Sequence, residues 1–115
     1  MAQPLVAPPS DGTGRVLAMA DVLTAEAVRN ELGGLADWSG DPAGIIRTVE
    51  LASFPAAVTV VDRVAVVAEE LDHHPDIDIR WRTLTFRCVT HSAGGVTLRD
   101  VELARRIDEI VGAAR

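Results

Sequence analysis

The sequence predicts an α+β domain in which helices cover one face of an antiparallel sheet. Helical and strand-like apolar patterns follow one another as helix, strand, helix, two strand segments and helix. A parallel βαβ protein would instead alternate strand and helix throughout. At 115 residues the chain is long enough for one hydrophobic core and too short for two domains of usual size.

The N-terminal residues differ in composition from the rest of the chain. Residues 1–14 are rich in proline, glycine and small polar residues, which bury too little apolar surface to offset the entropy lost on ordering. We therefore expect residues 1–20 to form a flexible extension and residues 21–115 to form the domain.

A short helix and a strand open the predicted domain. Thr24 can cap a helix in which Val28 and Leu32 repeat at helical spacing, until Gly33-Gly34 interrupts it. Apolar and polar residues then alternate over residues 45–51, which is typical of a half-buried strand. Arg47 falls on the apolar face of this strand.

The second helix is predicted between Ser53, which can cap it, and Asp72, over about 17 to 19 residues. Pro75 ends it, because a proline disfavours helical dihedral angles in the preceding residue. The expected apolar face consists of Val58, Val61, Ala65, Ala68 and Leu71.

Two strand patterns with opposite phase follow this helix. The first has apolar residues at the odd positions Ile77, Ile79 and Trp81, and the second at the even positions Leu84, Phe86 and Cys88. A tight turn or a bulge is therefore required near Arg82-Thr83, giving a hairpin or one bent strand. We assign Trp81 mainly to the core.

The third helix is predicted to begin at a capping box. Thr97 can cap it, with Asp100 in the place that glutamate usually takes in this motif. The apolar residues that mark the helix are Leu98, Leu103, Ile107, Ile110 and Val111.

Composition excludes several classes of function. A net charge of −6 and the absence of lysine argue against a nucleic-acid partner. No apolar run could span a bilayer and no secretory signal is recognisable, so we expect no membrane partner and a cytoplasmic location. The single cysteine, Cys88, excludes an internal disulfide and a thiolate zinc site, and its context is that of a small buried residue.

All three histidines lie within residues 69–100, at His73, His74 and His91. If the strand before His91 returns alongside the end of the second helix, the three imidazoles meet in one pocket. Asp100 would lie beside them, with Glu69 one helical turn before His73. Imidazoles can supply both the acid and the base for eliminating water, without a metal.

Other interpretations of these residues remain open. The His73-His74 pair could be purely structural, because cations are favoured at the C-terminal end of a helix. The three histidines and Asp100 could bind zinc, although adjacent ligands make tetrahedral geometry awkward. Asp100 could serve only as a helix cap, and Glu69 could be a solvated helix residue.

The spacing of these residues forms a longer pattern. Glu69 is followed after three residues by His73-His74-Pro75, after five more by Trp81, after nine by His91 and after eight by Asp100. This pattern resembles the signature of the pterin-4a-carbinolamine dehydratase family. The resemblance covers roughly residues 23–111.

The resemblance implies a fold of three helices packed on one face of a four-stranded antiparallel sheet, in homodimers or homotetramers. The implied reaction is dehydration of 4a-hydroxytetrahydrobiopterin, a pterin substrate, to quinonoid dihydrobiopterin. This reaction recycles the pterin of aromatic amino acid hydroxylases, so such a hydroxylase is an expected partner.

The resemblance also implies roles for individual residues, with no metal and no cofactor. The histidines His73, His74 and His91 would be catalytic. The residues implied to line the pterin site are Asp72, His73, His74, Thr90, His91 and Ser92. The residues implied to support it are Glu69, Asp100 and Trp38, the last standing where the family usually has a tryptophan after its first helix.

The sequence departs from the family pattern in a few places. Val49 and Leu51 stand where many members have aromatic residues, and Ser92 often differs. Relatives with this fold also serve as non-catalytic assembly chaperones or as dimerisation cofactors of transcription factors. The presence of all three histidines favours the enzyme over these alternatives.

Overall fold

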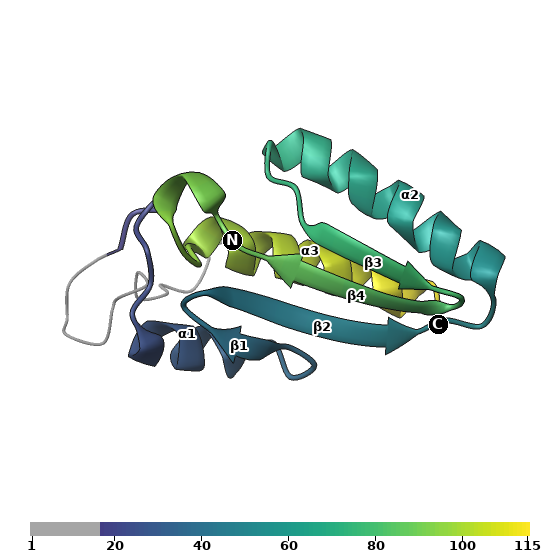
Figure 1. Cartoon of the computed structure of the whole chain (residues 1–115), viewed down its shortest axis with the longest axis horizontal. Coiled ribbons are helices and arrows are strands. Elements are labelled where there is room, and N and C mark those ends of the chain that lie inside the picture. Colours follow the sequence, from purple (N-terminus) through teal and green to yellow (C-terminus); the bar gives the residue numbers. More distant parts are fainter. Residues whose placement is uncertain (1–16) are drawn as a thin grey trace, which may run out of the picture.

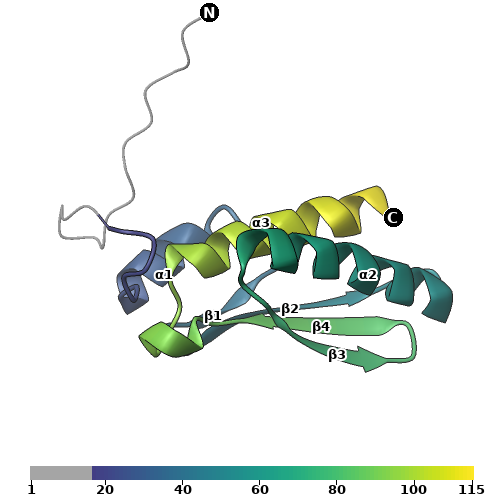
Figure 2. The same ribbon diagram turned by 90° about the horizontal axis from the view of Figure 1, so that it is seen from above.

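The computed structural model describes residues 17–115. Three helices lie on one face of a four-stranded antiparallel sheet with the strand order β1-β2-β4-β3 (Figure 1, Figure 2). The predicted fold class is therefore confirmed. The elements are α1 (Ala25–Leu32), β1 (Ser39–Asp41), β2 (Gly44–Glu50), α2 (Phe54–Leu71), β3 (Asp76–Arg80), β4 (Thr83–Cys88), the short 3-10 helix η1 (His91–Ala93) and α3 (Leu98–Ala113).

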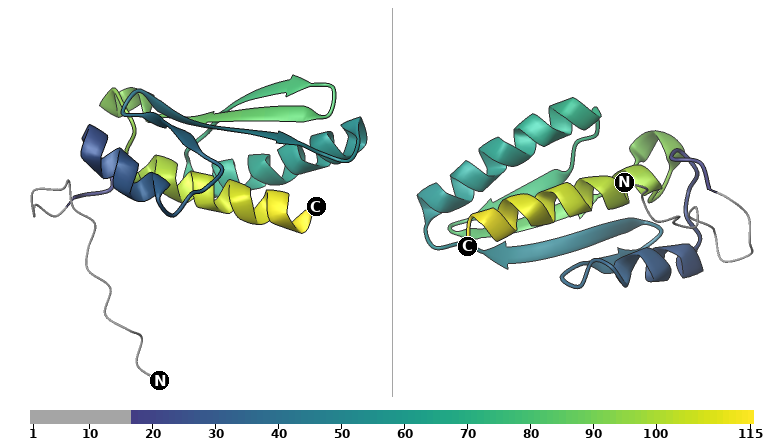
Figure 3. Two further views of the ribbon diagram at one scale, coloured as in Figure 1. Left: turned by 90° about the horizontal axis from the view of Figure 1, so that it is seen from below. Right: turned by 180° about the vertical axis from the view of Figure 1, so that it is seen from behind.

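The helix layer has α3 in its middle, with α2 on one side and α1 on the other (Figure 3). Within the described range 17–115, none of the helices is long and apolar enough to cross a membrane. Most of the predicted N-terminal extension lies outside the described residues. At its end Leu17 is only 7% exposed and belongs to the hydrophobic core.

The predicted helix starts are confirmed. The hydroxyl of Thr24 accepts a hydrogen bond from the backbone N–H of Ala27 (3.1 Å), and that of Ser53 accepts one from Ala56 (3.1 Å). Thr97 opens α3 with the predicted capping box, in which the Asp100 side chain accepts from the Thr97 backbone N–H (2.8 Å). These contacts satisfy N–H groups that have no partner within the helix.

The predicted buried face of α2 was right only in part: Ala68 is buried, and Val61 and Leu71 pack against the core, but Ala65 is exposed. Val58 is exposed, whereas the residues of α2 that lie buried in the structure are Ala57, Val60, Val64, Val67 and Ala68. Valines occur on all sides of this helix, so its spacing permits more than one apolar stripe. The sheet selects among them, because it buries the stripe that faces it.

The two opposed strand patterns form a hairpin, and the prediction that Trp81 lies in the core was wrong. Arg80 pairs with Thr83, so Trp81 and Arg82 form a two-residue turn between β3 and β4. Trp81 has φ 58° and is 74% exposed, with its ring 5.3 Å from the Arg82 guanidinium. A residue in a hairpin turn does not continue the alternation of the strand before it, so the pattern of β3 does not determine where the Trp81 side chain points.

One feature of the sheet was not anticipated from the residues. The short edge strand β1 pairs with β2 where the sequence indicated only a turn. Val49 and Leu51, which share one face of the predicted half-buried strand, are both buried. Aliphatic side chains therefore fill this part of the core.

Arg47 is buried on the core face of β2 because an acidic partner reaches it from α3. Its Nη1 donates to Asp108 Oδ1 (2.5 Å), and the same oxygen accepts from Trp38 Nε1 (2.8 Å). A buried charge requires such a partner. The cluster joins β2, α3 and the segment that follows α1.

We expect Asp108→Ala to lower the free energy of unfolding by about 2 kcal/mol, because it removes the nearest carboxylate from the buried Arg47 guanidinium and leaves only the exposed Asp37 within reach. Urea denaturation measures the change. Asp37→Ala is the matched control, because Asp37 approaches the same guanidinium from an exposed position (3.5 Å). Equal losses in the two variants would contradict the role given to Asp108.

Candidate active site

A polar pocket of about 360 Å³ lies where the end of α2, the segment after β4 and the start of α3 meet. All six residues predicted to line the site are found there, including the three histidines. The lining residues are Asp72, His73, His74, Val89, Thr90, His91, Ser92 and Arg99. The return of β4 therefore brings His91 to the end of α2, as the sequence led us to expect.

The end of α2 is a Schellman motif, which reverses the chain direction. The backbone N–H of His73 donates to Ala68 O (3.0 Å) and that of Asp72 to Glu69 O (3.3 Å). Asp72 adopts the left-handed conformation, with φ 48° and ψ 44°. Glycine usually takes this position, since a side chain there costs about 1 kcal/mol or more.

This turn sends the two adjacent histidines in different directions. His73 is directed into the protein and is 8% exposed, whereas the side chain of His74 is 57% exposed. An imidazole fixed by the core thus stands beside one that solvent and ligands can reach. On a continuous α-helix, two adjacent residues would instead lie about 100° apart around the helix axis.

Asp100 is fully buried and holds His73. Its Oδ1 accepts from His73 Nε2 (2.5 Å), and its Oδ2 accepts from the Thr90 hydroxyl (2.8 Å) and the Thr97 backbone N–H (2.8 Å). Thr97 in turn donates its hydroxyl to Thr90 (2.8 Å), because the single Thr90 proton is already used. Asp100 is therefore a helix cap and a histidine partner at once.

His74 pairs with Glu69, and this corrects one expectation. Glu69 Oε2 lies 2.5 Å from His74 Nε2, on the exposed side of α2. Glu69 was expected to share a helix face with His73, four residues later. The helix ends at Leu71, so the left-handed turn replaces the helical spacing and presents His74 to Glu69 instead.

His91 begins η1 and lines the same pocket. Gly94, with φ 81°, allows the loop to close, and Thr90 pairs with Gly95 across it. The His91 side chain is exposed, and within residues 17–115 it has no hydrogen-bond partner. Both of its ring nitrogens are therefore open to a ligand.

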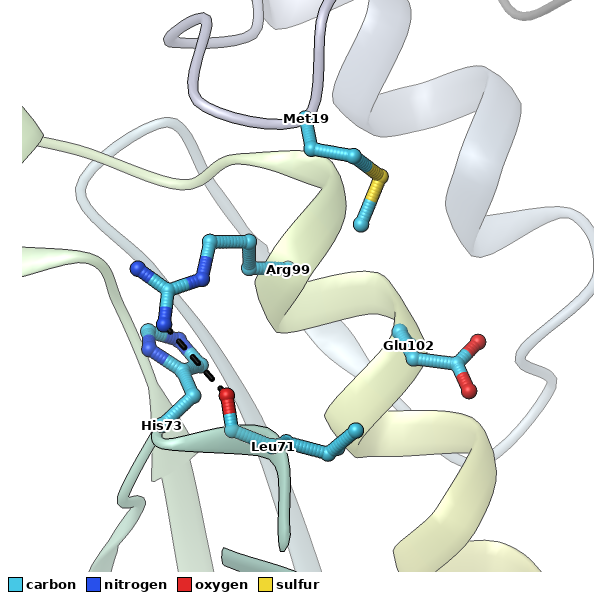
Figure 4. A pocket seen from close by; sticks show the side chains of 5 residues that line it. All are labelled: Met19, Leu71, His73, Arg99 and Glu102. Atoms are coloured by element: carbon cyan, nitrogen blue, oxygen red, sulfur yellow. Dashed lines mark hydrogen bonds between the residues drawn. The ribbon is translucent and has the colours of Figure 1, made fainter.

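Two residues have places that the sequence did not indicate. Trp38, expected to support the site, does not line the pocket; it lies in the core beside Asp108. Arg99 was missed, although it lines both this pocket and a smaller hollow of about 90 Å³ with Met19, Leu71 and Glu102 (Figure 4). Its position next to Asp100 was the only sequence signal for it.

Cys88 is buried below the site, as predicted. Burial, and secondarily the negative charge of Asp100, raise the pKa of the Cys88 thiol well above its usual range. The thiol therefore stays protonated and behaves as a small apolar side chain.

No group of three or more histidine, cysteine, aspartate or glutamate side chains in the described part of the chain is arranged to hold a metal ion. The zinc interpretation required His73, His74, His91 and Asp100 to converge. His73 and His74 instead turn to separate carboxylates.

Comparison with known families gives one match that covers most of the chain. The family model described as pterin 4 alpha carbinolamine dehydratase matches residues 21–110. A protein of Nocardia farcinica is 56% identical over 90 residues, which span 78% of this chain and 95% of that protein. One of Mycobacterium avium is 49% identical over 92 residues, spanning 80% and 98%. Both carry the provisional name pterin-4-alpha-carbinolamine dehydratase.

Two solved structures have a similar fold. A Brucella melitensis protein described as a transcriptional coactivator/pterin dehydratase superposes with a TM-score of 0.75 at 29% identity, covering 78% of this chain and 98% of that one. A pterin dehydratase-like protein, described as a RuBisCO assembly factor in the alpha-carboxysome, has a TM-score of 0.54 at 20% identity, covering 65% and 87%. The second likeness concerns the fold alone.

We expect Asp100→Ala to lower the free energy of unfolding by about 3 to 5 kcal/mol, because it leaves three buried donors without their acceptor. Asp100→Asn should cost less, since one amide oxygen can still accept. Denaturant unfolding measures both. Asp78→Ala, at an exposed carboxylate of β3, is the control, and a similar loss there would contradict the importance of the buried network.

Proposed function

Because the chain belongs to the pterin 4 alpha carbinolamine dehydratase family, we propose that it dehydrates 4a-hydroxytetrahydrobiopterin to quinonoid dihydrobiopterin. The observation that carries the proposal is the meeting of three histidines around one polar pocket, two of them paired with carboxylates. In this reaction the C4a–O bond breaks and the hydroxyl leaves as water. The neighbouring ring nitrogen loses a proton, and a C=N double bond forms.

We assign the base to His74. Glu69 accepts the Nε2 proton of this imidazole, so in the neutral ring Nδ1 carries the lone pair that can take a proton from the pterin. The same carboxylate stabilises the imidazolium that results. A carboxylate that orients a catalytic imidazole in this way is common to many hydrolytic sites.

We assign the acid to His91. It lines the same pocket as His74, and no described side chain holds either of its ring nitrogens. A protonated His91 can therefore donate to the departing hydroxyl. The exposure of both histidines allows them to regain their protonation states through solvent after each turnover.

His73 has a different task in this proposal. Its Nε2 is occupied by the buried Asp100, so it is fixed in position in the lining of the pocket. We infer that it orients the pterin, together with backbone groups of residues 72–74 and 90–92. Thr90 keeps Asp100, and through it His73, in place.

A non-catalytic role as an assembly chaperone or dimerisation cofactor is the alternative. The solved structures described as a coactivator and as an assembly factor make it a reasonable comparison. Neither role needs paired histidine and carboxylate side chains around a pocket, so the site favours catalysis. A well-folded protein that fails to accelerate dehydration would reverse this preference.

We also propose that the chain forms a homodimer or homotetramer, with an aromatic amino acid hydroxylase as the enzyme whose pterin it recycles. Ile79 and Trp81 are exposed on the edge strand β3 and its turn, where unpaired backbone groups can meet another chain. Sedimentation should therefore give a mass above 12.2 kDa. A monomer at micromolar concentration would contradict self-association.

We expect wild-type protein to accelerate the loss of the 4a-carbinolamine absorbance produced by a hydroxylase. His74→Ala and His91→Ala should each lower kcat about 10²- to 10⁴-fold, the usual contribution of an acid or base. Both side chains are exposed, so circular dichroism and thermal unfolding should remain close to wild type.

The control for this experiment is Arg80→Ala, at an exposed residue of β3 outside the pocket, which should retain full activity. Activity in the histidine variants equal to that of the control would contradict the assigned roles. If folded wild-type protein does not accelerate the dehydration, the proposed dehydratase function is contradicted.

A further inference from the structure

We propose that Arg99 is a positioning residue that holds the left-handed turn at the end of α2, and thereby sets the directions of His73 and His74. The effect of Arg99 on catalysis rests on the proposed dehydratase function. Its effect on the turn rests only on the contacts that Arg99 makes there.

Arg99 reaches the turn from the first turn of α3. Its Nη2 donates to the backbone oxygen of Asp72 (2.6 Å) and lies 3.5 Å from that of Leu71 (Figure 4 shows the latter). The next residue, Asp100, accepts from the side chain of His73. Two consecutive residues of α3 thus hold two consecutive residues after α2.

The turn needs this support for two reasons. Asp72 occupies a left-handed position that favours glycine, so its conformation must be stabilised from outside. The C-terminal end of a helix also carries partial negative charge, and the last turn of α2 contains no basic side chain. Arg99 supplies both a donor and a positive charge at that end.

The location of the turn makes its conformation important for the site. Asp72 separates the helical residue Leu71 from His73, so a change in its φ and ψ would redirect both histidines that follow. His74 would then lose its alignment with Glu69, and His73 its alignment with Asp100. Misplacement of reacting groups by about 1 Å can cost about 10²-fold in rate.

The first test measures the turn without any reaction. In Arg99→Met we expect amide hydrogen exchange at Asp72 and His73 to accelerate about 10-fold or more, because the turn opens locally. Arg106→Met is the matched control, since Arg106 also joins α3 to α2, through Glu70 (3.2 Å), but does not touch the turn. Unchanged exchange in Arg99→Met, or equal acceleration in both variants, would overturn the proposal.

The second test separates positioning from direct contact with substrate, which Arg99 could make because it lines the pocket. Arg99→Met should lower kcat about 10²-fold, and Arg99→Lys, which keeps one donor, should lose less. Adding Asp72→Gly to Arg99→Met should restore both the amide protection and part of kcat, because glycine adopts the left-handed conformation without strain. The single variant Asp72→Gly provides the reference rate.

The two kinds of failure can be told apart. If glycine at position 72 restores amide protection but none of the lost kcat, Arg99 acts on the substrate and the positioning role is overturned. If wild type shows no dehydration while the exchange results hold, the proposed function fails and the structural role of Arg99 stands.

Discussion

A single buried carboxylate, that of Asp100, determines where the parts of the site lie. It caps α3 through Thr97, holds the loop after β4 through Thr90 and fixes His73 after α2. A carboxylate removed from water is tolerated only when donors surround it, so none of these three contacts is optional. Three segments far apart in the sequence are thereby held around one point, and the pocket lies beside it.

The left-handed turn after α2 gives adjacent histidines different environments. His73 is fixed in the interior, whereas His74 and His91 are exposed in the lining of the same pocket. In the proposed reaction, this arrangement would separate the orienting histidine from the two that exchange protons with water. A protein that acts only as a scaffold and transfers no protons would need neither the turn nor the carboxylate partners. For this reason the site favours acid–base chemistry.

Local patterns predicted much of this architecture, and tertiary contacts determined the rest. The capping box at Thr97 and the helix end before Pro75 follow from neighbouring residues, and the structure confirms them. The break near Arg82 also follows from the sequence, and the structure shows that it is a hairpin and not one bent strand. Trp81 was misplaced because its left-handed backbone, which the phase of β3 does not reveal, carries it out of the sheet. Arg99 was missed because its acceptor is a backbone oxygen, which no sequence position identifies.

The most direct test of the account is to locate where a pterin binds. Titration of ¹⁵N-labelled protein with a dihydropterin, followed by NMR, should shift the imidazole signals of His74 and His91 and the amides of residues 72–74 and 90–92. Saturable shifts confined to that set are the predicted result. Shifts on the solvent-facing side of the sheet instead, or none at millimolar pterin, would contradict the assignment of the pocket as the pterin site.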